Sequence, residues 1–383
     1  MRGLGVCLAT VLTGLAAYAQ GVDRAFLNEL LAQPTETEDM DANNRCVAFM
    51  RDYLVGRGLH CTVLTNEMGR TCLYAATTPG KRHDYLFVSH TDVVPAADPS
   101  QYVPRTEGDW LYARGACDTK GNVAMIFRVL ENLLGKVSVA ALIATDEDGT
   151  PKEHGTPTPR MAIDAGYVPT RFIMVGDSAG EEPDQLFYAE KGHVRLKMTA
   201  RGHGGHSSRP WALDNPVPKL VAGYAKVMAK MPPPPTADDK WHDCLSPTML
   251  KGSDAGNQIA DEAYMTFSLR FIERDGRDTW MRFLRETSGL EVSWSGNYRL
   301  PVVSDPNDPH IQALLAALKR RIPAMRLGRM SAATDASYFA DLHLPTVIYA
   351  PTGEGAHGRC ERVSLKSLDD YADAMTEFLK GMK

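Results

Sequence analysis

The chain has 383 residues, which exceeds an ordinary single domain and suits two domains, or one domain interrupted by another. Hydrophobic residues make up 44% and charged residues 23%, so the composition is that of a globular protein and excludes a disordered or membrane-embedded chain. The formal net charge is only −5, and no basic stripe occurs along the chain, which excludes a nucleic-acid-binding surface.

The N-terminus has the parts of a secretory signal peptide. Arg2 is followed by an apolar run over residues 4–17 and by the small-x-small ending Ala17-Tyr18-Ala19. The run is shorter than the roughly 20 residues that a membrane span needs, which disfavours the alternative of an anchoring helix. We expect residues 1–19 to be cleaved off, leaving a secreted or periplasmic protein without a stable membrane anchor.

Six cysteines remain after this segment, at scattered positions: Cys46, Cys61, Cys72, Cys117, Cys244 and Cys360. No CxxC pair or short-spaced framework occurs among them. We expect a fold that does not depend on disulfides, although one or two bridges can form in an oxidising compartment, and their pairing stays open.

The mature chain begins with helix and strand patterns in alternation. An amphipathic stretch over 43–55 predicts a helix, and the strand-like residues 60–65 follow it. Residues 84–90 and 137–145 are apolar runs of buried-strand length, with a helical stretch over 120–134 between them. Strand, helix and strand in this order predict parallel strands joined by a right-handed crossover.

The middle of the chain, residues 191–297, has a different rhythm. Its predicted elements are a strand, a helix, two strands, a helix and a strand, over 193–202, 215–231, 246–251, 260–273, 278–286 and 290–295. This β-α-β-β-α-β order is ferredoxin-like.

The segments on either side of this block return to an α/β pattern. Residues 171–176 and 345–351 predict further buried strands, and helix and strand patterns continue over 309–321, 338–341 and 365–380. The middle block is therefore expected to be inserted into an α/β domain formed by residues 20–190 and 298–383.

Polar residues follow the predicted strands repeatedly, where ligands collect in open α/β sheets. The strand 84–90 ends in His90, which can bind a metal while Asp92 orients its ring, although an ordinary loop has the same residues. Asp118 precedes the helix at 120 and can be either a ligand or an N-cap.

Three consecutive carboxylates, Asp146, Glu147 and Asp148, directly follow a buried strand. Like charges so close repel, which indicates a cation or a proton-transfer task; the alternative is a solvated acidic turn. Two further strands lead into Asp177 and, after a short loop, His357. Each position is weak evidence alone, but the set of two histidines and several carboxylates predicts hydrolytic metal chemistry.

The motifs SHTDVVPA, GACDTKG, TDEDG, GDS, GHGGHSSRP and GEGAH, in this order, resemble the metallopeptidase family of aminoacylase, carboxypeptidase G, peptidase T and succinyl-diaminopimelate desuccinylase. The resemblance spans nearly all of the mature chain, and the order and spacing of the motifs make it specific. It implies an α/β, zinc-exopeptidase-like catalytic domain at 20–190 and 298–383, with an inserted ferredoxin-like dimerisation domain at 191–297.

The resemblance also implies two divalent metal ions. Zinc is the expected metal, with cobalt or manganese as alternatives. His90 and Asp177 would hold one ion, Asp148 and His357 the other, and Asp118 would bridge the two.

Further roles follow from the same resemblance. Asp92 would orient the histidine ligand before it, and Glu147 would be the general base that takes a proton from the water between the metals and passes it to the leaving amine. His206 would reach the active site of a partner subunit and steady the oxyanion, so a homodimer is expected. Asn257 and Arg270 would bind substrate polar groups, typically a carboxylate, to which arginine offers two parallel hydrogen bonds.

Two positions depart from the family pattern. The usual adjacent glutamates, base then ligand, appear here as Glu147-Asp148, and the shorter ligand shifts the metal or draws the loop closer. Many relatives have Glu at Asp177, and Asp recurs among those that act on peptides with a free amino terminus, which favours a dipeptidase or aminopeptidase. Glu361 and Asp335 also lie near family-like positions, without an assigned role.

Two other functions stay open. A deacylase would remove an acyl group from an N-acyl-amino acid with the same metals, so the expected partner is a small peptide or acyl-amino-acid substrate. A non-catalytic, metal-dependent binding protein is the third alternative. Glu147 argues against it, because a general base is the residue that such a protein would most easily lose.

Overall fold

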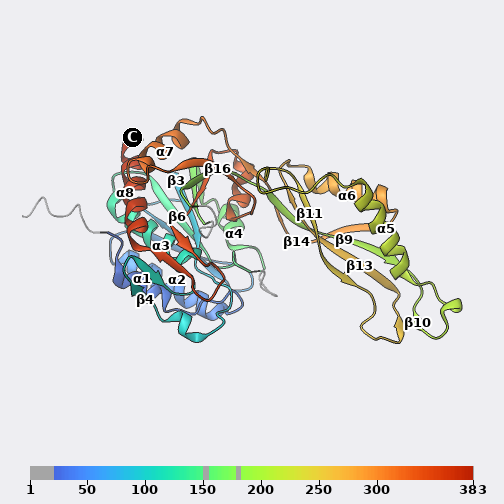
Figure 1. Ribbon diagram of the computed structural model, residues 1–383. Helices are drawn as coiled ribbons and strands as arrows, with labels where there is room; N and C mark the ends of the chain where they lie inside the picture. The colour runs from blue at the N-terminus through green and yellow to red at the C-terminus, as the bar shows by residue number, and fades with distance from the viewer. Residues whose placement is uncertain (1–20, 150–154, 178–182, 383) are drawn as a thin grey trace, which may run out of the picture.

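The computed structural model describes residues 21–149, 155–177 and 183–382, and these form two lobes (Figure 1). The larger lobe is built on a nine-stranded sheet, and the smaller lobe on a four-stranded sheet. The expected signal peptide lies outside the described residues. Within the described part of the chain, no helix is long and apolar enough to cross a membrane.

The larger sheet has a parallel centre and antiparallel edges. Its order is β1-β2-β6-β3-β7-β17-β8-β15, with β16 paired to β8, and β6, β3, β7 and β17 run parallel. The strands are β1 (His60–Thr65), β2 (Thr71–Ala76), β3 (Arg82–His90), β6 (Val139–Ala144), β7 (Val168–Gly176), β8 (Gln185–Glu190), β15 (Val302–Val303), β16 (Arg326–Met330) and β17 (Thr346–Tyr349). The predicted parallel pair is confirmed, because β3 and β6 are neighbours connected through α3 (Gly121–Leu133).

Both faces of this sheet are buried, as a parallel centre requires. Along β3, Tyr85 and Phe87 point into one apolar cluster, whereas Leu86 and Val88 point into another. The first cluster is covered by α1 (Arg24–Leu31), α2 (Met40–Val55), α3, α7 (Pro309–Lys319) and α8 (Leu365–Gly381). The second is covered by α4 (Thr158–Asp164) and the 3-10 helix η4 (Asp335–Leu342).

Short elements complete the larger lobe. A small sheet contains β4 (Arg105–Glu107), β5 (Trp110–Tyr112), β18 (Gly353–Glu354) and β19 (Arg362–Ser364). A 3-10 turn, η1 (Pro99–Tyr102), precedes it, and a π-helical turn, η2 (Ala116–Lys120), leads into α3. The six cysteines of the described residues are free thiols.

The smaller lobe has the predicted ferredoxin-like element order. It runs through β9 (Gly192–Arg201), α5 (Pro216–Lys230), β11 (Cys244–Lys251), β13 (Glu262–Phe271), α6 (Gly276–Ser288) and β14 (Glu291–Arg299). The strands pair antiparallel in the order β11-β13-β9-β14. Val194, Leu196 and Met198 of β9 pack in one cluster with Leu220 of α5 and Leu284 of α6, so both helices cover the same face.

At its far tip the smaller lobe carries a two-stranded ribbon, β10 (Gly205–His206) with β12 (Gln258–Ile259) (Figure 1). A 3-10 turn, η3 (Pro210–Ala212), follows β10. The predicted fold class, an α/β lobe with an inserted ferredoxin-like block, is therefore confirmed. The residue limits of the two domains stay a prediction.

Candidate metal centre and active site

The candidate ligands meet because they follow neighbouring parallel strands. His90 ends β3, Asp148 lies four residues after β6, Asp177 directly follows β7, and His357 lies eight residues after β17. These four strands are adjacent in the larger sheet and point the same way. Their carboxyl ends therefore bring the side chains to one edge, as the sequence predicts.

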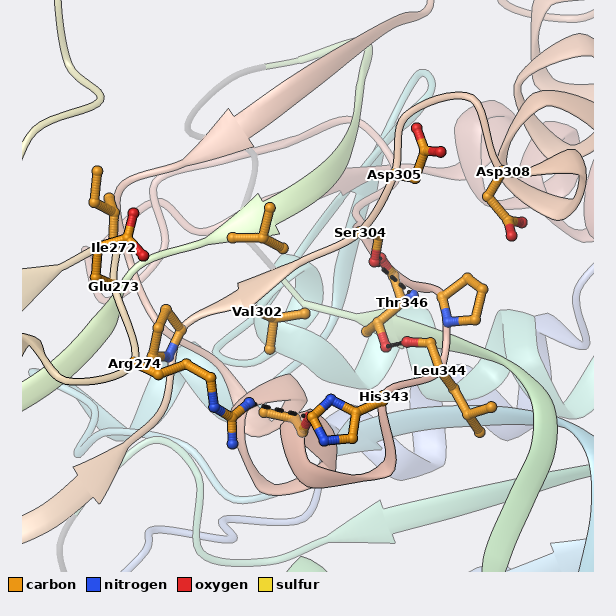
Figure 2. A pocket seen from close by; sticks show the side chains of 14 residues that line it. Ile272, Glu273, Arg274, Val302, Ser304, Asp305, Asp308, His343, Leu344 and Thr346 are labelled. Atoms are coloured by element: carbon orange, nitrogen blue, oxygen red, sulfur yellow. Dashed lines mark hydrogen bonds between the residues drawn. The ribbon is translucent and has the colours of Figure 1, made fainter.

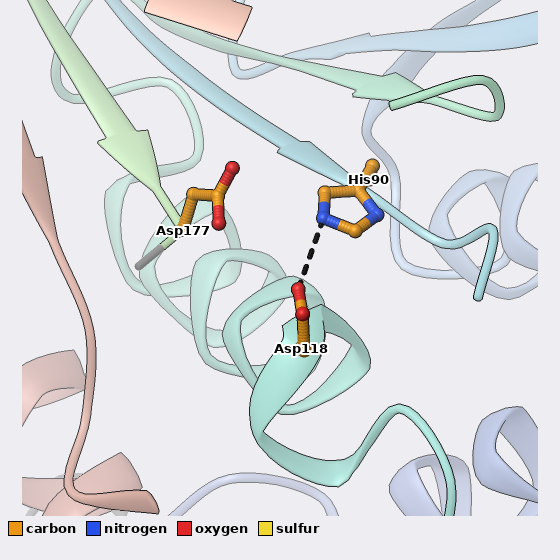
Figure 3. A group of neighbouring side chains, drawn as sticks. All are labelled: His90, Asp118 and Asp177. Atoms are coloured by element: carbon orange, nitrogen blue, oxygen red, sulfur yellow. Dashed lines mark ion pairs between the residues drawn. The ribbon is translucent and has the colours of Figure 1, made fainter. Parts of the chain in front are cut away.

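One group consists of His90, Asp118 and Asp177, whose candidate ligand atoms lie within 4.8 Å of one another (Figure 3). His90 Nε2 lies 3.3 Å from Asp118 Oδ1. Asp118 comes from η2 and is not the N-cap of α3, since that position belongs to Lys120. The alternative that Asp118 is the N-cap of this helix is therefore wrong.

A second group consists of Asp118, Asp148 and His357. His357 Nε2 lies 3.0 Å from Asp118 Oδ2 and 2.8 Å from Asp148 Oδ1. The two oxygens of Asp118 thus face two different histidines. This is the arrangement of a carboxylate that bridges two sites.

The charges of the cluster fit a pair of cations. Burial lowers the pKa of His90, but the carboxylates of Asp118 and Asp92 outweigh it and hold that pKa well above its usual value. Hydrogen bonds from Asp118 and Asp148 raise the pKa of His357 to about 10. The carboxylates that raise the pKa of both histidines would attract a pair of divalent cations in the same way.

The chemistry of the donors fits as well. His90 Nε2 is buried without a hydrogen bond of good geometry among the described residues. Imidazole nitrogens and carboxylate oxygens are ligands that zinc accepts in catalytic sites. The residues of the two groups are therefore suited to hold two divalent metals.

Asp92 connects the histidine ligand to the acidic loop. Its main-chain oxygen and its Oδ1 lie 3.1 Å and 3.4 Å from His90 Nδ1. Its two carboxylate oxygens accept hydrogen bonds from the backbone N–H groups of Glu147 and Asp148, at 3.1 Å and 3.0 Å. The geometry suits the predicted orienting role, and it adds a contact that fixes the loop carrying Glu147.

Glu361, for which the sequence suggested no role, holds the turn that carries Asp118. Its Oε1 accepts hydrogen bonds from the backbone N–H groups of Cys117 and Asp118, both at 3.1 Å. Its Oε2 forms a buried ion pair of 2.7 Å with Arg114. Glu361 therefore acts on the centre by positioning Asp118.

Glu147, the candidate base, is held by a residue that sequence reasoning missed. Arg299 Nη1 lies 2.7 Å from Glu147 Oε1 and 3.7 Å from an oxygen of Asp335. Burial lowers the pKa of Arg299, but the two carboxylates outweigh it and raise that pKa. Arg299 therefore fixes the direction of the Glu147 side chain. An arginine near a strand end is usually a solvated surface residue, and so no signal in the sequence marked it.

A cavity of about 300 Å³ lies between the metal cluster and the smaller lobe. Glu147, Asp148 and His357 line one side, and Arg270 from β13 lines the other. The structure therefore brings the predicted carboxylate-binding arginine to the same space as the predicted base and metal ligands.

His206 and Asn257 lie elsewhere, at the tip of the smaller lobe (Figure 1). The backbone N–H of Ser207 donates to the carbonyl oxygen of Asn257 at 2.9 Å, so the two predicted residues are neighbours. His206 is exposed, and its Nδ1 lies 2.8 Å from the hydroxyl of Ser208. The chain does not bring either residue to its own cavity, and their action in a partner subunit stays a prediction.

A larger cavity, of about 460 Å³, lies where the two lobes meet and contains none of the candidate ligands (Figure 2). The hydroxyl of Ser304 donates to the carbonyl oxygen of Thr346 at 2.8 Å, and Arg274 forms an ion pair with Asp341 across the junction. This cavity therefore lies at the junction of the two lobes, apart from the candidate metal centre.

Glu190, at the end of β8, is fully buried close to the site. Its Oε2 accepts hydrogen bonds from the backbone N–H and the hydroxyl of Thr334, at 2.9 Å and 2.8 Å. Burial raises the pKa of Glu190 to about 8, so the folded protein holds a neutral carboxyl there at neutral pH.

This burial predicts a pH-dependent effect of Glu190→Gln on the metal-free protein. A raised folded-state pKa stabilises the fold fully below the unfolded-state pKa, and the contribution is lost as pH rises towards 8. The variant lacks this titration. Relative to the wild type, its free energy of unfolding should therefore rise by up to about 1.4 kcal/mol per pH unit across that window. Thermal unfolding of both proteins from pH 5 to pH 8 measures the difference; parallel curves would contradict the buried neutral carboxyl.

Comparison with known proteins agrees with this geometry. The sequence profile of peptidase family M20/M25/M40 matches residues 86–381. A succinyl-diaminopimelate desuccinylase from Bordetella petrii is 25% identical over 381 residues, covering 94% of this chain and 97% of the relative.

Solved structures show the same fold. An M20-family metallo-carboxypeptidase from Sulfolobus solfataricus matches with a TM-score of 0.73 and 16% identity, covering 93% of this chain and 98% of the other. The aminopeptidase PepT from Bacillus cereus matches with a TM-score of 0.71 and 16% identity, covering 94% of this chain and 98% of the other. The chain therefore belongs to peptidase family M20/M25/M40 and is a metallohydrolase.

Proposed function

We propose that the protein is an exopeptidase of the dipeptidase or aminopeptidase type, which hydrolyses the amide bond of a small peptide. The observation that carries the proposal is the cavity that Arg270 lines together with Glu147 and with Asp148 and His357 of the second ligand group. Asp177 supports the choice of a peptidase, because aspartate at this position is typical of relatives that act on free amino termini. Similarity in fold to an aminopeptidase is in keeping with it.

The residues suggest the following division of work. Two bound divalent metals, which we propose to be zinc, would polarise the scissile carbonyl and make hydroxide available near neutral pH. Glu147, fixed by Arg299, takes a proton from the attacking water and delivers it to the leaving nitrogen. Arg270 binds a carboxylate of the substrate through paired hydrogen bonds and so sets the distance between this group and the scissile bond.

The alternative is a deacylase that releases an amino acid from its N-acyl form. The relatives named succinyl-diaminopimelate desuccinylase favour it. Assays of free dipeptides beside their N-acylated forms, with the metal-reconstituted protein, separate the two functions. We expect turnover of the free dipeptides, and exclusive cleavage of the acylated forms would overturn the peptidase proposal.

We also propose that the enzyme works as a homodimer with shared active sites. His206 and Asn257 sit at the tip of the smaller lobe, away from their own cavity, where they can serve a second subunit. In this arrangement His206 of the partner subunit donates to the oxyanion of the tetrahedral intermediate.

His206→Ala is therefore expected to lower turnover by about 100-fold to 1,000-fold, the usual cost of losing an oxyanion donor. Mixing His206→Ala protein with Glu147→Gln protein should restore part of the activity, since a hybrid dimer contains one intact site. Activity that stays lost although mass spectrometry proves subunit exchange would contradict a shared site.

The N-terminal segment supports a proposed location outside the cytoplasm. Its charged start, apolar run and Ala17-Tyr18-Ala19 ending are typical of a cleaved signal peptide. The intact mass of protein from the native cell should correspond to a chain that begins at Gln20. A full-length mass in a cytoplasmic fraction would exclude secretion.

A further inference from the structure

The open face of the four-stranded sheet forms a wall of the active-site cavity. α5 and α6 cover the opposite face, so the open face is free to carry polar side chains. Strand pairing arranges these side chains in rows. Arg270, His193 and Arg299 form the first row, in which Arg299 pairs with Glu147. Ser268, Arg195 and Ser295 form the next row. Arg195, two residues along β9 from His193, lines the cavity with the first row.

Two basic residues further along β9 are neutralised within the lobe. Lys197 Nζ lies 3.3 Å from Glu262, and Arg201 Nε lies 3.1 Å from Glu291. Arg195 lies on the same strand and the same face, but its side chain has neither an ion pair nor a hydrogen bond among the described residues. The unpaired cation of the strand is thus the one that faces the cavity.

Arg270 is unpaired in the same sense, as its guanidinium group has no ion pair or hydrogen bond within the described ranges. The positive charge of this wall lowers the pKa of His193. Burial and the charges of Arg270, Arg299 and Arg195 together bring this pKa to about 4. Because Arg299 already pairs with Glu147, the guanidinium groups of Arg195 and Arg270 remain to attract anions from the cavity.

We propose that Arg195 binds a second carboxylate of the substrate, so that the enzyme prefers substrates with two carboxylates, one on Arg270 and one on Arg195. The inference rests on the proposed hydrolysis of a small amide substrate. Arg195 and Arg270 are diagonal neighbours across the β9–β13 pair, a relation that places Cα atoms about 7–8 Å apart. Two flexible side chains at this spacing can converge on the carboxylates of one dicarboxylic unit.

Two sources can supply this chemistry, an acidic C-terminal residue of a peptide or a dicarboxylic acyl group. Matched pairs separate them: Ala-Glu against Ala-Gln, and N-succinyl-leucine against N-butyryl-leucine. For the metal-loaded full-length enzyme, Arg195→Gln should lower kcat/KM for the pair member with two carboxylates by about ten-fold or more, the effect of losing a charge-assisted hydrogen bond. The other member should change by less than about two-fold, and the pair that responds identifies the source.

Arg201→Gln is the matched control, because it removes the same group from the same face at a position neutralised by Glu291. It should leave the ratio of kcat/KM between the two members of each pair unchanged. The Arg195 side chain is exposed and without a hydrogen bond or ion pair among the described residues, and the ion pairs of Arg201 are exposed, so both variants should unfold close to the wild-type temperature. Equal losses for both members of each pair, or no loss in Arg195→Gln, would overturn the proposal.

A binding measurement keeps this inference separate from the proposed function. Glutarate carries two carboxylates and butyrate one, and both can be titrated calorimetrically into the metal-loaded protein. We expect Arg195→Gln to weaken glutarate about ten-fold and to leave butyrate unchanged. If no amide is turned over, the proposed function fails, while equal affinities of wild type and variant for glutarate would reject the role of Arg195.

Discussion

Glu147→Gln is expected to lower turnover by about 100-fold to 10,000-fold, the usual contribution of general acid-base catalysis. Glutamine keeps an oxygen that can accept the hydrogen bond from Arg299, so the side chain should hold its place. It cannot take a proton from water at neutral pH. The loss should therefore appear in kcat, while KM and metal content stay close to those of the wild type.

Asp146→Asn provides a matched control from the same acidic loop. Asp146 accepts a hydrogen bond from the backbone N–H of Thr158 at 3.0 Å and belongs to neither ligand group. Asparagine can keep this contact, so turnover should fall little. Undiminished activity in Glu147→Gln, or equal losses in both variants, would remove Glu147 from the mechanism.

Asp118→Ala is expected to abolish activity through loss of both metals. Asp118 is the residue common to the two ligand groups, and its two oxygens lie 3.3 Å and 3.0 Å from His90 and His357. Replacing partners of metal ligands typically weakens metal binding by about 10-fold to 100-fold, so removal of a shared ligand should cost more at each site. Elemental analysis after dialysis against a chelator measures the retained metal per chain.

Glu354→Gln is the control for loss of a carboxylate near the centre. Glu354 lies three residues before His357, but it pairs with Arg362 on the exposed side of the small sheet. This variant should retain metal and activity. Retention of two ions by Asp118→Ala would contradict the bridging role.

The sequence marks ligands well because strand ends are local features. His90 ends one buried strand and Asp177 directly follows another, and neighbouring parallel strands must deliver such residues to one edge. The ferredoxin-like block could be predicted for a similar reason, since the apolar alternation of β9 and β13 is regular over ten residues. These inferences need only periodicity and chain order.

Some elements of the larger lobe could not be predicted in this way. α1 has only eight residues, below the length at which a helical period is distinctive. β2 ends in two alanines, which are weak strand formers, and β16 contains a glycine and two arginines. Tertiary pairing with β6 and β8 makes them strands, and this information is not local.

The roles of the two positioning residues could not be predicted from the sequence for a physical reason of the same kind. Glu361 reaches the backbone of Asp118 across 243 residues of chain, and Arg299 reaches Glu147 across 152. An isolated charged residue in the sequence is most often solvated, so only the folded contacts distinguish these two. Arg195 belongs to the same class, since its importance rests on the strand register that turns it towards the cavity.

The central claim is that two cations share Asp118 at the carboxyl end of the larger sheet. Anomalous diffraction from crystals of active protein, collected at the absorption edge of the metal found by elemental analysis, tests it directly. We predict two peaks per chain on either side of Asp118, one beside His90 and Asp177 and the other beside Asp148 and His357. A single peak, or peaks that are not in contact with Asp118, would contradict the proposed centre.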